Sequence, residues 1–265
     1  MTEQLAESTP PALFQTERQR EIAATTITSG RVEVAELADR FGVTTETIRR
    51  DLSDLQRQRV VRRVHGGAIP WETAGFEPLL SVRDDQQDAE KRRLARVAVN
   101  ELPDTGAIII DSGSTLTRFA EALPPDCALS VVTNSLRTAQ ILADFEHLEV
   151  VVIGGKVRKN TLAMVDTEAV AAIEPLVVDT LFISSDGMSP ANGLTTPYRE
   201  EAALKQAMIK AARRVIALVD HSKLGQDHFI RYASWSEVDV LVTTTEVPPD
   251  TVAAIEALGT TVLLA

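Results

Sequence analysis

The sequence has little of three things that often reveal the class of a protein: cysteine, long apolar runs and net positive charge. Its single cysteine, Cys127, excludes an intramolecular disulfide and a Cys-rich zinc site. No apolar run reaches the length of about 18 residues that a membrane-spanning helix needs, and the N-terminus lacks the basic start and apolar stretch of a secretory signal. We therefore expect a cytoplasmic protein. His147 and His228 have no partner at ligand spacing and are interpreted as surface residues, so we expect no metal and no cofactor.

Positive charge is scarce overall but concentrated near the N-terminus. The 265 residues include 27 Lys and Arg against 38 Asp and Glu, a net charge of −11. Residues 17–65 contain ten arginines and eight acidic residues, which gives +2 and leaves −13 for the rest of the chain. A length of 265 residues favours two domains of unequal size. The acidic total therefore does not exclude nucleic acid as a partner of one of them.

Helical patterns follow a tail, residues 1–14, that we expect to be flexible. The first helix is predicted from Gln15 to Thr28 and the second ends at Gly42, a residue suited to a left-handed turn. A third is predicted to start after Thr44 as its N-cap. Its apolar residues form one stripe, namely Ile48, Leu52 and Leu55. Two helices joined by a tight glycine turn, the second with a polar N-terminus, are typical of a DNA-binding helix-turn-helix.

The segment after the third helix has β-branched residues around Arg62-Arg63 and ends at Gly66-Gly67, which predicts a small β-ribbon, or wing. The alternative interpretation of the arginines is a solvated basic helix face. The order of turn, cap and ribbon favours a DNA-binding domain over residues 15–70. The candidate DNA-contacting residues are Thr45, Thr47, Arg49, Arg50, Arg57, Arg62, Arg63 and His65.

Residues 71–87 have a weak pattern, with Gly75 and Pro78, and are interpreted as a linker. Over residues 88–265, short β-branched runs alternate with helical patterns. Such alternation predicts an α/β domain with a mostly parallel sheet that helices cover on both faces. The expected fold is therefore multidomain: an N-terminal winged helix-turn-helix, helical with a small β wing, followed by this α/β domain.

Five predicted strands of the α/β domain end in polar loops. Ligands of open α/β sheets bind outside the carboxyl ends of strands, so the five loops predict one effector site. Each loop alone is also what an ordinary turn and helix cap would look like. The candidate effector-binding residues are Asp111, Ser112, Gly113, Ser114, Thr115, Thr133, Asn134, Ser135, Gly154, Gly155, Lys156, Asp186, Gly187 and Lys223.

These loops contain the groups that a phosphorylated sugar needs. The loop 111–115 opens a helix and offers backbone N–H groups and hydroxyls to an anion, while Gly113 permits close approach. Lys156 or Lys223 could supply positive charge, and the carboxylates of Asp111 and Asp186 could accept hydrogen bonds from sugar hydroxyls.

The stretches "TTETIRRDLSDL" and "RRVHGGA" resemble the DeoR family of bacterial sugar-metabolism regulators, whose winged helix-turn-helix carries a T-I-R-R-D-L core and an R-x-H-G-G-A exit. Arg59 departs from the family, which usually has a glycine there. The resemblance extends over residues 88–245, where the family's effector domain is similar to the ribose-phosphate isomerase fold and carries D-x-G-S-T, T-N-S, G-G, D-G and D-x-S-K motifs in this order. Glu201-Ala202 and Lys205 fit the family's E-A-x-x-K helix. Asp166, often glycine in the family, implies a different effector, and His221 is often serine.

The resemblance implies a transcriptional regulator, expected to be a repressor, that binds operator DNA and senses a phosphorylated sugar. The alternative is an isomerase-like sugar-phosphate enzyme that carries a DNA-binding appendage. Isomerases of this fold have further acidic residues directly after D-G, whereas Asp186-Gly187 is followed here by Met188-Ser189-Pro190. We therefore expect a sensor without catalytic residues. We further expect a homo-oligomer, either a dimer or a tetramer, that places two winged modules on DNA half-sites about one helical turn, or a multiple of it, apart.

Overall fold

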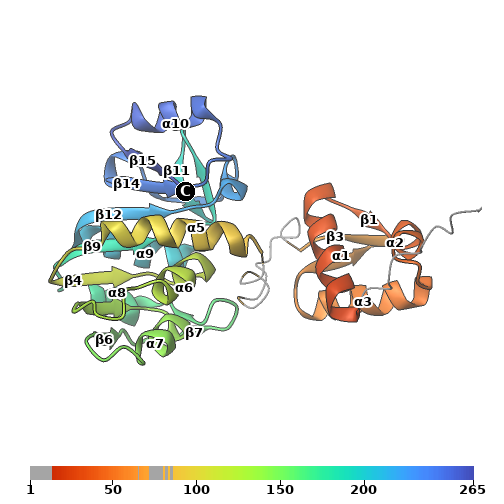
Figure 1. Cartoon of the computed structure of the whole chain (residues 1–265), viewed down its shortest axis with the longest axis horizontal. Helices are drawn as coiled ribbons and strands as arrows, with labels where there is room; N and C mark the ends of the chain where they lie inside the picture. Colours follow the sequence, from red (N-terminus) through yellow and green to blue (C-terminus); the bar gives the residue numbers. More distant parts are fainter. Residues whose placement is uncertain (1–13, 65, 72–79, 81–82, 84–85) are drawn as a thin grey trace, which may run out of the picture. The chain divides into compact units, whose positions relative to one another are not determined.

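The computed structural model describes residues 14–64, 66–71, 80, 83 and 86–265. The chain forms two compact units, Met1–Val82 and Arg83–Ala265 (Figure 1). The boundary lies inside the segment interpreted as a linker, residues 71–87. Most of that segment, the expected tail except for Phe14, and the candidate DNA contact His65 lie outside the described residues.

The N-terminal unit is a small winged helix-turn-helix, as predicted. Its helices are α1 (Gln15–Ser29), α2 (Val34–Phe41) and α3 (Thr45–Arg57). Its strands are β1 (Val32–Glu33), β2 (Val61–Val64) and β3 (Gly67–Pro70), which pair antiparallel in the order β1-β3-β2. The hairpin β2–β3 is the predicted wing, and β1 is an element that the sequence pattern did not indicate.

Local chemistry explains the boundaries of these elements. Gly42 adopts φ +63° after α2, and its N–H bonds to Ala38 and Asp39 carbonyls. Thr44 caps α3, because its hydroxyl accepts the Thr47 N–H at 3.2 Å. A Cβ at Gly67 would lie 1.9 Å from the Val32 carbonyl oxygen, so β3 pairs with β1 only because this residue is glycine.

Arg59, where the family usually has glycine, follows α3 with φ +59°. The left-handed conformation that favours glycine is therefore kept here with an arginine side chain. The predicted stripe of Ile48, Leu52 and Leu55 is buried, as expected.

The C-terminal unit is built on a seven-stranded parallel sheet (Figure 1). Its strands, in spatial order, are β15 (Thr261–Leu264), β14 (Val240–Thr243), β12 (Ala212–Leu218), β9 (Val178–Ile183), β4 (Ala107–Ile110), β5 (Ser130–Thr133) and β6 (Glu149–Val152). The chain runs outward from β4 to β6, returns to β9, and then runs outward to β15 on the other side. The direction of winding therefore reverses between the neighbours β4 and β9, which is a topological switch point.

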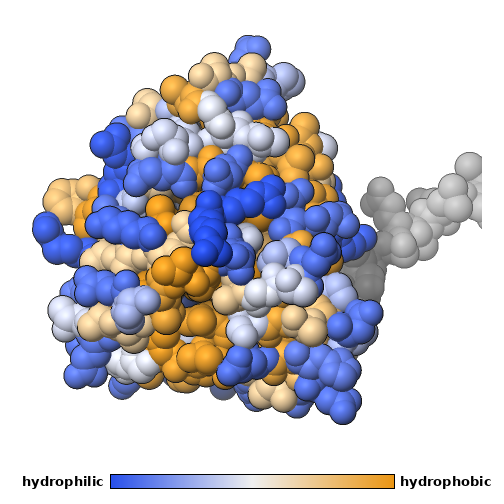
Figure 2. All heavy atoms as spheres, turned by 90° about the vertical axis from the view of Figure 1, so that its left-hand side faces the viewer, coloured by the Kyte–Doolittle hydropathy of each residue, from blue (hydrophilic) through white to orange (hydrophobic). Residues whose placement is uncertain are grey.

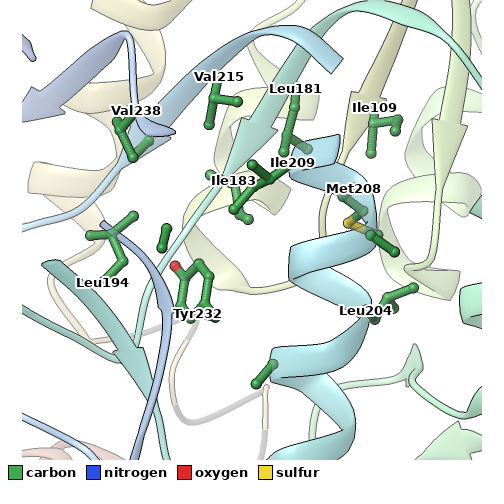
Figure 3. Close-up of a cluster of buried hydrophobic side chains, with 14 of the residues drawn as sticks. Ile109, Leu181, Ile183, Leu194, Leu204, Met208, Ile209, Val215, Tyr232 and Val238 are labelled. Atoms are coloured by element: carbon green, nitrogen blue, oxygen red, sulfur yellow. The ribbon is translucent and has the colours of Figure 1, made fainter. Parts of the chain in front are cut away.

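Helices cover both faces of this sheet. On one face, α5 (Asp88–Ala98), α6 (Ser114–Glu121) and α7 (Leu136–Leu142) pack with Ile108 and Ile110. On the other, α8 (Thr167–Ile173), α9 (Arg199–Ala211) and α10 (Pro249–Glu256) pack with Ile109. The apolar run of β4 thus serves two cores, as expected for a strand buried on both faces. Figure 3 shows Leu204 and Met208 of α9 within the second core.

Two small antiparallel sheets were not predicted. One contains β10 (Gly187–Ser189), β11 (Gly193–Thr196) and β13 (Ile230–Ala233), and the other is the hairpin of β7 (Val157–Arg158) and β8 (Ala163–Met164). The remaining elements are the short helices η2 (Val99–Glu101), η3 (His221–Lys223) and η4 (Trp235–Glu237). In the described part of the chain, every helix is too short or too polar to cross a membrane.

Candidate DNA-binding and effector sites

Residues of α1 contact two of the acidic residues of α3, Asp51 and Asp54. Arg18 Nε lies 2.6 Å from Asp51 Oδ2, and the Asp51 side chain is only 1% exposed. Asp54 accepts hydrogen bonds from the amides of Gln15 and Gln19 at 3.2 and 3.3 Å. These contacts leave the outer side of α3 more positive than a count of its residues suggests.

The structure brings α3 and the wing together. The Arg63 side chain donates a hydrogen bond to Ser53 Oγ of α3 at 2.8 Å, and the Arg63 N–H donates to Gln56 Oε1 at 3.0 Å. The exposed candidate DNA contacts on these elements are Thr45, Arg49, Arg50, Arg57, Arg62 and Arg63, while Thr47 is half-buried beside the cap. Arg49 pairs with Glu46 and Arg57 with Asp54, both on the helix surface, where such pairs are weak and exchangeable.

In the C-terminal unit, the central polar cluster lies at the topological switch point. Asp111 follows β4, and Ser184 follows the neighbouring strand β9. Lys205 of α9 joins them, because its ammonium pairs with Asp111 Oδ2 and donates to the Ser184 carbonyl at 2.9 Å. The side chains of Lys205 and Asp111 are 8% and 1% exposed. Burial opposes the charge of Lys205, but the Asp111 carboxylate outweighs burial and keeps the pKa of the ammonium above its usual value.

Asp186 forms the second part of the cluster. Its Oδ2 accepts a hydrogen bond from Thr196 at 2.8 Å, and its Oδ1 lies 3.4 Å from Arg83 Nη2. Burial opposes ionisation of Asp186, but the charges of Arg83, Lys205 and Lys223 and the Thr196 hydrogen bond outweigh it, so the pKa of the carboxyl is lowered. Lys223 thus acts on Asp186 through its charge, and its ammonium has no ion-pair partner within 4.0 Å among the described residues.

The third part of the cluster comes from the hairpin β7–β8 and from α9. Arg158 pairs with Glu201 Oε1, and its guanidinium lies over the Tyr198 ring, 3.5 Å from the centroid. Glu201 Oε2 is 3.4 Å from the Thr196 hydroxyl, which connects this pair to Asp186. The seven charged residues of the cluster are the cations Arg83, Arg158, Lys205 and Lys223 and the anions Asp111, Asp186 and Glu201. Four positive charges minus three negative charges give the cluster +1.

The loop after β4 leads into α6 next to this cluster. Gly113 has φ +119°, a conformation that favours glycine, and a Cβ there would meet no atom within 4 Å. Open space therefore lies beside Gly113, and an anionic ligand needs such space to approach the backbone. Ser114 and Thr115, in the first turn of α6, are buried, and Ser112 Oγ lies 3.5 Å from Asp111 Oδ1. The first-turn N–H groups of a helix lack partners within the helix and attract anions.

The loop after β5 is largely occupied by its own hydrogen bonds. The Thr133 hydroxyl accepts the Ser135 N–H, and the Ser135 hydroxyl caps α7 by accepting the Thr138 N–H. The Asn134 amide donates to the Met164 carbonyl at 3.3 Å. Its Oδ1 is buried and has no hydrogen-bond partner among the described residues. Of the three candidate residues, Asn134 therefore retains an acceptor for a ligand.

The remaining candidates are held by the fold itself. Asp166 caps α8 and also accepts the Lys156 N–H at 2.8 Å, so it anchors the loop of Gly154 and Gly155 that follows β6. Gly155 has φ +134°, and the Lys156 side chain is exposed. The structure gives this loop no hydrogen bond or ion pair with the Asp111 cluster among the described residues.

Gly187 has a packing role. A Cβ at this position would lie 1.7 Å from the Gln226 carbonyl oxygen, so glycine permits close contact between β10 and the loop before β13. Three of the predicted effector residues therefore belong to the charged cluster, through contacts or through charge: Asp111, Asp186 and Lys223.

Sequence reasoning missed several members of the cluster. Glu201 and Lys205 lie one helical turn apart on one face of α9, and this i, i+4 spacing in the E-A-x-x-K helix was the available signal. Thr196 and Tyr232 come from the unpredicted sheet, and Tyr232 donates its hydroxyl to the Ser184 carbonyl at 2.9 Å. The interpretation of His228 as a surface residue was wrong: it is half-buried, and its Nε2 lies 3.2 Å from the Asp186 carbonyl oxygen.

His221, which departs from the family pattern, lies outside this cluster. Its Nδ1 is 2.9 Å from Glu90 Oε2 of α5, and Glu246 lies close enough for the three side chains to form a group of metal-ligand type. Two hydrogen bonds from Arg93, at 2.8 and 3.0 Å, already neutralise Glu246. The group therefore links α5 to the loops after β12 and β14, through the contact of His221 with Glu90 and the ion pair of Arg93 with Glu246.

A winged helix-turn-helix joined to an α/β unit with a polar cluster at its switch point defines a ligand-responsive DNA-binding protein. Two family models match the chain: the DeoR-like helix-turn-helix domain over residues 18–73 and the DeoR C terminal sensor domain over residues 86–245. The HTH-type transcriptional regulator GlpR of Haloferax volcanii is 35% identical over 95% of this chain and 98% of its own length. The glycerol-3-phosphate regulon repressor of Escherichia coli K12 is 31% identical over 89% of this chain and 92% of its own.

The chain therefore belongs to the DeoR family. It is a transcriptional regulator and not an enzyme, which confirms the prediction made against the isomerase alternative. Among solved structures, ribose 5 phosphate isomerase A from Neisseria gonorrhoeae is similar at 20% identity, over 52% of this chain and 54% of that chain, with a TM-score of 0.40.

Proposed function

We propose that the protein is a cytoplasmic homo-oligomer that represses genes of sugar metabolism and changes its affinity for operator DNA when a phosphorylated sugar binds beside Asp111 and Asp186. The observation that carries this proposal is the local charge. The unit has an excess of acidic residues, yet the cluster at its switch point carries four cations against three carboxylates.

A phosphate monoester suits this cluster. It carries about −1.5 to −2 charges near neutral pH, and its oxygens can accept from the first-turn N–H groups of α6 and from a lysine. Lys223 is the cation of choice, because its ammonium has no ion-pair partner among the described residues, whereas Lys205 and Arg158 are tightly paired. In this proposal, the carboxylate of Asp186 and the Asn134 Oδ1, which has no partner among the described residues, accept hydrogen bonds from sugar hydroxyls.

The effector site is tested by Lys223→Met, since the buried Asp186 carboxylate keeps the charges of Arg83 and Lys205 after this change. Losing one charged hydrogen bond of about 1.5–3 kcal/mol should weaken the binding of the effector by about 10- to 150-fold. DNA affinity without effector and the melting temperature should stay unchanged. The matched controls are Lys210→Met, an exposed lysine of α9, and Lys156→Met. If Lys156→Met alone weakens binding, the phosphate lies at the loop after β6 and the proposed position is wrong.

The DNA-binding surface is tested by Arg50→Ala. Arg50 is exposed on the outer side of α3, so its removal should cost about 1–3 kcal/mol of operator affinity at fixed salt. Arg20→Ala, an exposed arginine of α1, is the control that keeps the overall charge change the same. Equal losses for both variants would mean that the arginines act through general charge and that α3 does not read the operator.

Two surface features support the homo-oligomer. Figure 2 shows the side of the sensor unit at which the strands of the large sheet begin, and apolar side chains gather in the lower half of this view. The edge strand β6 also exposes Val151 and Val152, and exposed apolar edges are typical of association surfaces. Two DNA-binding units in one assembly would match two operator half-sites. Sedimentation of the DNA-free protein as a monomer at micromolar concentration would contradict this part of the proposal.

A further inference from the structure

We propose that Arg83 is a phosphate-binding residue of the sensor site, paired with Asp186 until the phosphate of a ligand replaces that carboxylate. Arg83 is the first residue of the sensor unit, so its change of partner acts on the chain segment that leads from the DNA-binding unit. This inference rests on the proposed function and adds to it the residue through which an occupied site affects DNA affinity.

The carbonyl of Arg83 is held by a residue of the sensor unit. Lys91 of α5 is buried, and its ammonium donates hydrogen bonds to the carbonyls of Arg83 and Gln86. The side chain of Arg83 then reaches Asp186, 103 residues further along the chain, and is only 16% exposed. Arg83 therefore contacts the sensor unit through both its carbonyl and its side chain, and the side-chain contact belongs to the effector cluster.

The contact between Arg83 and Asp186 is one in which a phosphate can replace the carboxylate. Its 3.4 Å separation is longer than the roughly 2.7–2.9 Å of a strong charge-assisted hydrogen bond. Asp186 keeps other support when Arg83 leaves, because Thr196 donates to it and the charges of Lys205 and Lys223 act on it. A guanidinium binds phosphate with two parallel hydrogen bonds, so a phosphate is a better partner for Arg83 than this carboxylate oxygen.

The exchange of partners by Arg83 explains how binding of the effector changes the affinity for operator DNA. A ligand changes a protein's preference between two arrangements only if it binds one of them more tightly. A phosphate held by Arg83 favours the arrangement in which this side chain no longer contacts Asp186. It thereby shifts the equilibrium between the two arrangements of the protein, in which Arg83 has different partners. Couplings of this kind typically change the affinity for the second ligand, here operator DNA, by about 5- to 150-fold.

The test is a pair of variants in full-length protein: Asp186→Asn, and Asp186→Asn combined with Arg83→Ala. The asparagine background removes the carboxylate of Asp186, so a loss caused by Arg83→Ala in this background does not come from breaking the ion pair. Calorimetry measures binding of glucose 6-phosphate, fructose 6-phosphate, glycerol 3-phosphate and inorganic phosphate to each. Adding Arg83→Ala should weaken the binding of the recognised compound by about 10-fold or more, the loss of one charged hydrogen bond. If the ion pair only held the structure together, removing Arg83 from the Asp186→Asn protein would change nothing, and the inference would be refuted.

The coupling is measured as the ratio of operator affinities with and without a saturating concentration of that compound. Arg83→Ala should bring this ratio to within about twofold of one, far below an ordinary coupling, while Arg93→Ala, which breaks the exposed pair with Glu246, should retain the wild-type ratio. A wild-type ratio in Arg83→Ala would also refute the inference. If the wild-type protein binds none of the four compounds, the proposed function fails and the inference fails with it. If it binds one and the two Asp186→Asn variants behave alike, only the inference fails.

Discussion

Replacing Lys205 with methionine should destabilise the sensor unit strongly. The change leaves the Asp111 carboxylate, 1% exposed, without its counter-charge and removes the hydrogen bond to the Ser184 carbonyl. Removing one member of a buried ion pair typically costs about 3–5 kcal/mol. For a unit of this size each kcal/mol lowers the melting temperature by about 2–4 °C, so we expect a decrease of roughly 6–20 °C.

The assay is urea or thermal unfolding followed through Trp235, which is buried in the sensor unit. The double variant Lys205→Met with Asp111→Asn removes both charges, and because no uncompensated carboxylate remains, it should recover at least half of the lost stability. Wild-type stability in Lys205→Met would show that the pair is not the central support of the cluster. A double variant as unstable as the single one would show that packing of the lysine stem, and not the charge on Asp111, explains the loss.

Two further predictions concern stability. Thr44→Ala removes the N-cap of α3 and should cost the N-terminal unit about 1 kcal/mol, or roughly 4–8 °C, in thermal unfolding; Thr45→Ala, which removes no cap, is the control, and equal effects would contradict the cap. The lowered pKa of Asp186 contributes stability above the ordinary carboxyl pKa of about 3.9, and this stability is lost as pH falls through the folded-state value. The free energy of unfolding should therefore fall below about pH 4, with a smaller slope in Asp186→Asn; an unchanged slope would contradict the role of Asp186.

The features that depend only on neighbouring residues were predictable from the sequence. Thr44 as a cap, Gly42 as a left-handed turn and the buried stripe of Ile48 follow from rules that involve only neighbouring residues. The α/β class was equally accessible, because alternating strands and helices allow few arrangements. The placement of Asp111 and Asp186 at the carboxyl ends of strands followed from the same rule.

Contacts between distant parts of the chain were not predictable from local patterns. Lys205 and Asp111 are 94 residues apart, and their pairing depends on β4 and β9 being neighbours in the sheet. Thr196 reaches the cluster from an antiparallel sheet whose short strands carry weak periodicity. Arg83 lies in a segment that reads as a linker, and its contacts with Lys91 and Asp186 are made within the sensor unit.

The proposed function requires that one chain both binds operator DNA and responds to a phosphorylated sugar. Its most direct test is the affinity of the full-length protein for the promoter region beside its own gene, measured at one fixed salt concentration. The measurement is repeated with glucose 6-phosphate, fructose 6-phosphate, glycerol 3-phosphate and the unphosphorylated compounds. We predict specific binding that one phosphorylated compound shifts by about fivefold or more and that its unphosphorylated form does not shift. Binding that no compound shifts, or no specific binding at all, would contradict the account.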